Sequence, residues 1–138
     1  MTSAFTHAID VRYGECDQQG IVFNANYLAY VDDAMDHWMR SLELEEWTTG
    51  WDVVLKSARV TWHSSARWPE RLSLDCGVGR WGSTSFDVVY RLRVQDRPVA
   101  DAVITYVSID PGTQRPVSTP EPVRDALGPV VATPESLA

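Results

Sequence analysis

The segment NANYLAYVDDAMDHWMRSL, residues 24–42, alternates apolar and polar residues with the period of an α-helix. Its apolar residues recur at steps of three and four and therefore share one face. They are Tyr27, Tyr30, Val31, Ala34, Trp38, Met39 and Leu42. The pattern predicts an amphipathic helix of about four to five turns. We expect it to begin at Asn24, with the side chain of Asn24 or Asn26 capping its first turn.

Strand-like segments flank this helix on both sides. In FTHAIDVRY, residues 5–13, one face carries Phe5, His7, Ile9, Val11 and Tyr13, the period of two typical of a half-buried strand. His7 is interpreted as a packed or hydrogen-bonded histidine. Beyond a predicted linker at residues 44–50, β-branched and aromatic residues predict strands near residues 52–64, 71–80, 84–95 and 99–109.

The short connections between these later strands favour antiparallel pairing, because parallel strands need long crossovers. One face of such a sheet needs an apolar cover, and the chain offers one long helix. The predicted fold is therefore α+β, a five-stranded antiparallel sheet wrapped around one long central helix. The 138 residues suit a single domain, which we place at residues 1–128 with a short helix at Glu121–Leu127. Residues 129–138 are predicted to form a flexible C-terminal tail.

The net charge and the composition of the chain exclude several classes of function. A net charge of −7 argues against binding to nucleic acid or to an anionic membrane surface. The sequence has no apolar run long enough to span a membrane and no basic, apolar opening typical of a signal peptide, so we expect a cytoplasmic protein. Cys16 and Cys76 lack the paired spacing of a zinc site or a disulfide framework. We interpret both as free thiols and predict no metal site.

The segment ECDQQGIVFNANY, residues 15–27, joins an acidic turn to the predicted start of the helix. The backbone N–H groups at a helix start lack partners within the helix and lie at the positive end of its dipole. A carboxylate in such a place can attack a carbonyl carbon or activate a water, and the N–H groups can stabilise the oxyanion that forms. Asp17 and the N–H near Asn24 are candidates for these two parts. The alternative is that Asp17 and Gly20 only build a turn.

The longer segment RYGECDQQGIVFNANYLAYVDDA, residues 12–34, resembles the opening of the 4-hydroxybenzoyl-CoA thioesterase family of hot-dog acyl-CoA thioesterases. RWPERLSLDCGV, WGSTSFDVVYRL and QRPVSTPEPVRDAL are similar to the later strands and closing segment of that family. The resemblance implies a hot-dog fold and hydrolysis of a small or medium acyl-CoA, with no cofactor other than the coenzyme A of the substrate. It also implies a homodimer or homotetramer that binds acyl-CoA where two subunits meet.

Site residues follow from the same resemblance. Asp17 corresponds to the general base or nucleophile, and the backbone N–H of Asn24 to the group that polarises the thioester carbonyl. Gly20 is expected to allow close approach of the ligand, Tyr27 to line the acyl pocket, and Asp32 to touch the acyl group or orient the surroundings of Asp17. The predicted coenzyme A contacts are Arg59, Val60, Thr61, Ser83 and Thr84.

Two other functions are compatible with the same fold. A non-catalytic acyl-CoA-binding hot-dog protein would use Asp17 only to stabilise the turn. A hot-dog hydratase or dehydratase would need a histidine paired with an acid in a wet polar pocket, and the histidine-containing helix start of the fatty-acid dehydratases is absent from the sequence.

Overall fold

The computed structural model describes residues 3–45 and 50–138. The strands are β1 (Phe5–Asp10), β2 (Asp52–Trp62), β3 (Arg71–Trp81), β4 (Ser85–Val94) and β5 (Arg97–Ile109). The helices are α1 (Asn26–Ser41) and α3 (Glu121–Leu127), with single 3₁₀ turns at Tyr13–Glu15 and Glu135–Leu137. Among these described residues, no helix is both long enough and apolar enough to cross a membrane.

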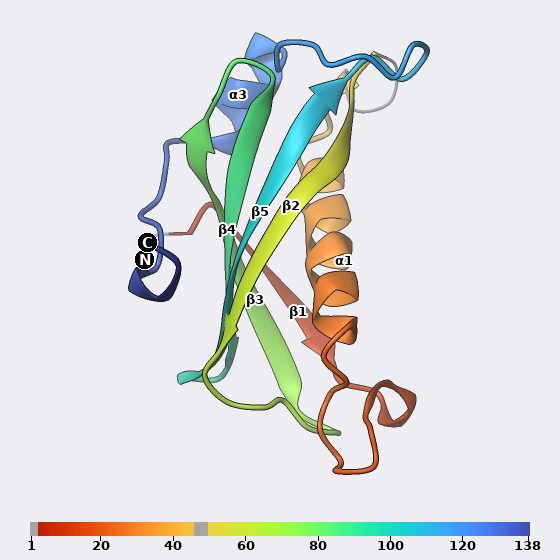
Figure 1. The fold of residues 1–138 in the computed structure, drawn as a ribbon, viewed down its shortest axis with the longest axis vertical. Helices are drawn as coiled ribbons and strands as arrows, with labels where there is room; N and C mark the ends of the chain where they lie inside the picture. Colours follow the sequence, from red (N-terminus) through yellow and green to blue (C-terminus); the bar gives the residue numbers. More distant parts are fainter. Residues whose placement is uncertain (1–2, 46–49) are drawn as a thin grey trace.

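The five strands form one antiparallel sheet in the order β1-β3-β4-β5-β2. The chain leaves β1, crosses the face of the sheet as α1 and returns along the opposite edge as β2 (Figure 1). This arrangement confirms the predicted hot-dog fold. Each strand boundary lies within two residues of its predicted place, except the C-terminal end of the first strand, which lies at Asp10 rather than near Tyr13. The predicted linker at residues 44–50 lies partly outside the described residues.

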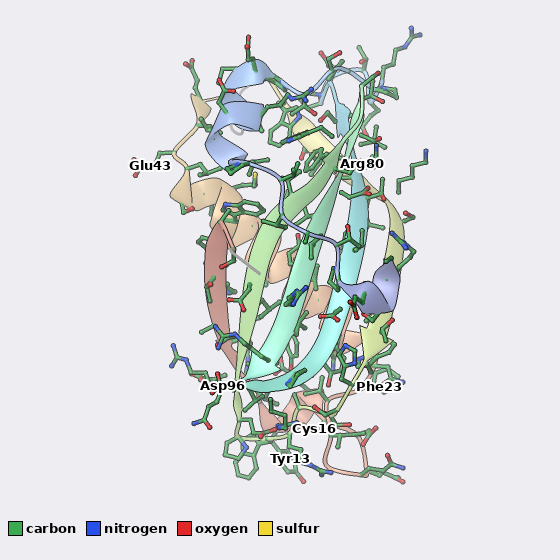
Figure 2. All side chains as sticks on the ribbon, turned by 90° about the vertical axis from the view of Figure 1, so that its left-hand side faces the viewer. Tyr13, Cys16, Phe23, Glu43, Arg80 and Asp96 are labelled. Atoms are coloured by element: carbon green, nitrogen blue, oxygen red, sulfur yellow. The ribbon has the colours of Figure 1, made fainter. Side chains whose placement is uncertain are left out.

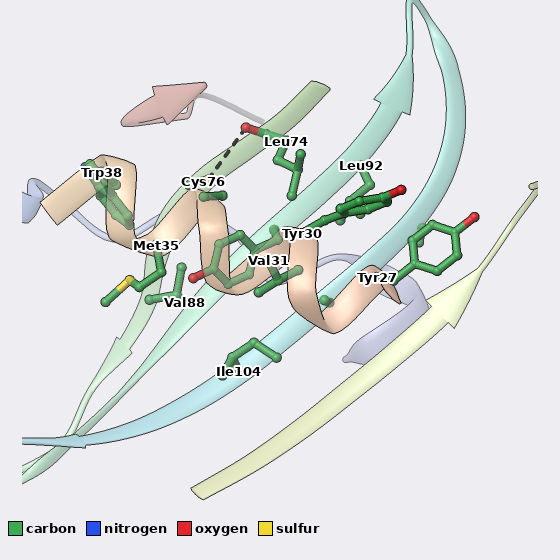
Figure 3. Close-up of a cluster of buried hydrophobic side chains, with 14 of the residues drawn as sticks. Tyr27, Tyr30, Val31, Met35, Trp38, Leu74, Cys76, Val88, Leu92 and Ile104 are labelled. Carbon is green, nitrogen blue, oxygen red and sulfur yellow. Dashed lines mark hydrogen bonds between the residues drawn. The ribbon is translucent and has the colours of Figure 1, made fainter. Parts of the chain in front are cut away.

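The apolar stripe of α1 packs against the sheet and forms the core with it. Figure 3 shows its side chains directed at residues of β3, β4 and β5, among them Leu74, Val88 and Ile104. The buried residues of the helix are Tyr27, Tyr30, Val31, Ala34, Met35, Trp38 and Met39. Burial of such a stripe, rather than helix propensity, supplies most of the stability of a helix in a protein. The sheet therefore determines where α1 lies.

Strand β1 ends earlier than the alternation of the sequence predicts. It stops at Asp10, and Tyr13 lies in the following 3₁₀ turn with 78% of its surface exposed, not on the apolar face of the strand. The last hydrogen bond that follows β1 is donated by the N–H of Val11 to the carbonyl of Glu70, just before β3, at 2.9 Å. The turn then directs Tyr13 away from the core.

Residues 129–138 lie along the outer face of the sheet, which corrects the prediction of a flexible tail. The N–H of Val131 donates to a carbonyl of β3 at 2.7 Å, and Leu137 is 8% exposed beside Val89 and Val103. Val131 can approach because Gly77 lies beneath it: a Cβ at Gly77 would come within 2.7 Å of Val131 Cγ1. A glycine in β3 thus makes the room in which this segment docks.

Candidate active site

Asp17 opens a tight turn immediately before the helix. Its N–H donates to the carbonyl of Ile21 at 2.9 Å, and its carbonyl accepts from the N–H of Gly20 at 3.0 Å. Gly20 has φ +77°, a conformation that glycine adopts without strain. Asp17 Oδ1 accepts from the N–H of Gln19 at 2.8 Å. One carboxylate oxygen thus builds the turn, as the simpler interpretation of this motif predicts, while Oδ2 has no recorded partner among the described residues.

Glu15 connects this turn to the first turns of α1. Its Oε1 accepts from the N–H of Arg12 at 2.8 Å and from the hydroxyl of Tyr30 at 2.9 Å. Its backbone carbonyl accepts from the N–H of Phe23 at 3.0 Å and from the side-chain amide of Asn26 at 2.8 Å. Burial, followed by the hydrogen bond to Glu15, holds the pKa of Tyr30 well above its usual value, so Tyr30 remains a donor. The turn and the helix are therefore one bonded unit.

The helix begins at Asn26, two residues later than the sequence predicts, with Ala25 at the N-cap position and no side-chain cap. The predicted cap is wrong because the amide of Asn26 is directed to Glu15 instead. Within residues 3–45 and 50–138, no hydrogen bond is recorded from the backbone N–H of Asn24 or of Ala25. These two exposed donors precede the positive end of the helix, where an anionic oxygen is favoured.

A surface cleft of about 440 Å³ lies beside the turn. Its lining residues are Tyr13, Cys16, Asp17, Gln18, Gly20 and Trp68. Tyr13 and Trp68 meet edge to face with ring centroids 5.8 Å apart and are 78% and 54% exposed. Tyr13 and Cys16 lie at one end of the molecule (Figure 2). The sequence predicts Asp17 and Gly20 but misses this aromatic wall, since Tyr13 fits a strand alternation and Trp68 reads as part of a turn.

Asn24, Tyr27 and Asp32 are not among the residues that line this cleft. Tyr27 is 2% exposed, and its hydroxyl accepts from the N–H of Ala66 at 3.1 Å. It is a core residue within one chain rather than the wall of an open pocket. Asp32 is exposed and lines a different cleft of about 490 Å³ between α1 and β2, together with Asp52 and Tyr106.

The predicted coenzyme A contacts on β2 do not form one surface. Arg59 Nη1 donates to the carbonyl of Leu137 at 2.8 Å, and Thr61 Oγ1 donates to the carbonyl of Ser136 at 3.4 Å. Val60 packs against the core instead. Neighbouring side chains of a strand point to opposite faces, and here the outer face is occupied by the C-terminal segment. Arg59 and Thr61 thus have partners within their own chain.

The other predicted contacts, Ser83 and Thr84, lie in the loop between β3 and β4. The carbonyl of Thr84 accepts from the N–H of Ser108 at 2.8 Å. Arg80, near the end of β3, lies at the opposite end of the molecule from Tyr13 and Cys16 (Figure 2). A single chain therefore does not bring this loop to the Asp17 cleft.

Both cysteines are free thiols, as predicted. Cys76 is buried, and desolvation raises the pKa of its thiol to about 12. It remains protonated at neutral pH and is a packing residue, because only the thiolate is a good nucleophile. Cys16 is half-buried, with Sγ 3.9 Å from the carbonyl of Arg12.

The chain is similar in sequence and in structure to known proteins. It is 22% identical to the acyl-CoA thioesterase YbgC of Haemophilus influenzae over 131 residues, which are 92% of this chain and 96% of that protein. Among solved structures, a Pseudomonas aeruginosa protein matches with a TM-score of 0.81 at 23% identity, covering 91% of this chain and 90% of that one. A 1,4-dihydroxy-2-naphthoyl-CoA thioesterase from Synechocystis matches with a TM-score of 0.78 at 19% identity, covering 89% and 94%.

These structural likenesses establish the fold. The family follows from a separate match, because the family model of the thioesterase-like superfamily covers residues 11–127, from the end of β1 to the end of α3. The match includes the Asp17 turn, α1 and the whole sheet after β1. It confirms the predicted kind of enzyme, a thioester hydrolase. The chain belongs to the thioesterase-like superfamily.

Proposed function

We propose that the protein hydrolyses a small or medium acyl-CoA at the cleft beside Asp17. One observation supports this site above the others: the Asp17 turn is bonded through Glu15 to the start of α1, where the N–H groups of Asn24 and Ala25 have no recorded partner in the described chain. A carboxylate oxygen and two backbone donors are thus held in one rigid unit. The name of the Haemophilus relative supports acyl-CoA as the substrate class.

Two routes can use this arrangement. In the general-base route, Asp17 takes a proton from water, the hydroxide adds to the thioester carbon, and the C–S bond breaks as the proton passes to the departing coenzyme A sulfur. In the nucleophilic route, Asp17 attacks the same carbon, coenzyme A leaves, and water hydrolyses the resulting anhydride. In both, the N–H groups at the helix start stabilise the oxyanion, a contribution of about 3 to 4 kcal/mol per donor in other enzymes.

The alternative at this site is a purely structural role for Asp17. The hydrogen bond from the N–H of Gln19 to Asp17 Oδ1 is compatible with it, since a residue needed only for its turn would make this same bond. The two roles differ in what Asp17 Oδ2 does, because the turn uses only Oδ1.

We also propose that two chains associate along β2, so that the acyl-CoA site is completed by a second subunit. β2 is an edge strand of 11 residues, whereas β1 at the other edge has six. Val54, Leu55 and Trp62 on β2 are 42%, 53% and 44% exposed. A long edge strand with exposed apolar side chains is a template for pairing with another strand. Pairing of two chains along β2 would also place residues of the second chain near a cleft that is open to solvent in a single chain.

Replacing Asp17 by Asn tests catalysis separately from turn formation. The amide oxygen of Asn can still accept from the N–H of Gln19, so the turn should persist, but the neutral side chain can neither take a proton nor attack. We expect kcat for acyl-CoA hydrolysis to fall at least about a hundredfold, with the unfolding midpoint unchanged. The measurement is steady-state hydrolysis of an acyl-CoA panel, followed with a thiol reagent.

Asp110→Asn is a matched control, because Asp110 Oδ1 also accepts backbone N–H bonds, from Gly112 at 2.8 Å and Thr113 at 3.0 Å. This variant should keep full activity. Undiminished turnover in Asp17→Asn would remove Asp17 from the chemistry and leave it a structural role in the turn.

Replacing Glu15 tests the link between the turn and the helix. Glu15→Ala removes the acceptor of the Tyr30 hydroxyl and the Arg12 N–H, so we expect a loss of about 1–3 kcal/mol in the free energy of unfolding, measured by urea denaturation, together with a lower kcat. Glu15→Gln retains an acceptor oxygen and should lose much less of both. Equal effects of the two substitutions would show that charge, not the hydrogen-bonded link, matters at this position.

Replacing Val54 by Lys tests the β2 contact between subunits. A lysine on an edge strand opposes strand pairing, so the variant should sediment as a single chain at concentrations where the wild type forms dimers or tetramers. Val130→Lys, which changes another exposed valine outside β2, should leave the mass unchanged. A wild type that is monomeric throughout would contradict the association.

A further inference from the structure

A second group of functional side chains lies away from the Asp17 cleft, where β1 meets α1. His7 comes from β1, and Asp33 and His37 lie one turn apart on α1. Residues four apart on a helix share a face, so the two helix residues point in the same direction. Two of the three histidines of the chain therefore lie beside the carboxylate of Asp33.

The trio is already organised by close contacts. His7 Nε2 lies 2.9 Å from Asp33 Oδ2, and His37 Nδ1 lies 3.5 Å from Asp33 Oδ1 and donates to the backbone carbonyl of Asp33 at 2.9 Å. The rings of His7 and His37 stack with centroids 4.2 Å apart. The three candidate ligand atoms lie within 4.8 Å of one another.

These separations are close to those required around one transition-metal ion. With metal–ligand bonds of about 2.0–2.2 Å, two ligand atoms lie about 3.0 Å apart at a right angle and about 3.4 Å apart at a tetrahedral angle. The recorded separations, 2.9 Å from His7 Nε2 to Asp33 Oδ2 and 3.5 Å from His37 Nδ1 to Asp33 Oδ1, are close to these values, with one carboxylate oxygen facing each ring. Binding through one of these oxygens needs a movement of the His37 side chain toward the other two ligand atoms, for which its 50% exposure leaves room.

We propose that His7, Asp33 and His37 bind one divalent transition-metal ion of the zinc, cobalt or nickel class. Two imidazoles and one carboxylate suit these ions, whereas magnesium and calcium prefer oxygen ligands. In binding, each neutral imidazole keeps one proton: the proton on the coordinating nitrogen, His7 Nε2 or His37 Nδ1, is exchanged through water for one on the other ring nitrogen, and the freed lone pair binds the ion. Asp33 is 50% exposed, so water can reach the ion and fill its remaining positions. The bound ion cross-links β1 and α1 and so stabilises the edge of the sheet.

Metal titration of tag-free, chelator-treated protein tests this proposal. We expect one Co²⁺ per chain with a visible d–d absorption band, displacement of Co²⁺ by Zn²⁺, and a rise in the thermal unfolding midpoint with either ion. Mg²⁺ should have no such effect. A cobalt spectrum with a strong thiolate charge-transfer band would place the ion at a cysteine and overturn the proposal.

Variants locate the ion. His37→Gln removes an exposed ligand and leaves the His7–Asp33 pair intact, so it should fold normally in chelator while its Zn²⁺ affinity falls at least about tenfold. His63→Gln is the matched control: His63 Nε2 also lies 2.9 Å from a carboxylate, that of Asp101, but outside the trio, and this variant should bind like the wild type. Absence of stoichiometric binding, full affinity in His37→Gln, or loss of affinity in His63→Gln would each refute the site.

Discussion

Burial of the apolar stripe of α1 in the sheet is the constraint on which the candidate site depends. The helix buries that stripe against the sheet, and this packing fixes the position of its first turn relative to the strands. Glu15 then fastens the Asp17 turn to that first turn through Tyr30 and Asn26. A carboxylate and unpaired backbone donors, both costly to orient on a loose loop, are thereby held by the core itself.

This dependence explains which parts of the site could be predicted from the sequence. The period of the helix, the alternation of the strands and the Asp–Gly turn are local patterns, and local patterns specify elements and their order. Asp17 can be proposed from the sequence because the turn and the helix start that it would serve are its neighbours in the sequence as well as in space. The role of Glu15 cannot be predicted from the sequence because it depends on the hydroxyl of Tyr30, which lies in α1. In the sequence, Tyr30 looks like one more member of the apolar stripe.

Contacts between distant parts of the sequence are what local patterns do not show. The prediction of coenzyme A contacts at Arg59 and Thr61 did not include residues 129–138, which return to the outer face of the sheet and accept hydrogen bonds from both side chains. Nothing local in that proline-containing segment indicates this docking, which depends on Gly77 in β3. The trio of His7, Asp33 and His37 was hidden in the same way, since its members come from two elements and one of them was interpreted as a packed strand residue.

The positions of the Asp17 and Asp32 clefts are also relevant to the proposed association of two chains. The Asp17 cleft and the cleft that Asp32 lines next to β2 are separate. The loop that carries Ser83 and Thr84 follows β3 near Arg80, which lies at the opposite end of the molecule from Tyr13 and Cys16 (Figure 2). The proposed association along β2 is a way to combine regions of two chains in one acyl-CoA site.

The most direct measurement is a crystal structure with a non-hydrolysable ketone analogue of an acyl-CoA, in which a methylene group separates the sulfur from the carbonyl carbon. The account predicts that the carbonyl oxygen lies about 2.7–3.1 Å from the N–H of Asn24 or Ala25, with the Asp17 carboxylate on the other side of the carbonyl carbon. An analogue bound with its carbonyl in the Asp32 cleft, and Asp17 facing solvent, would contradict it.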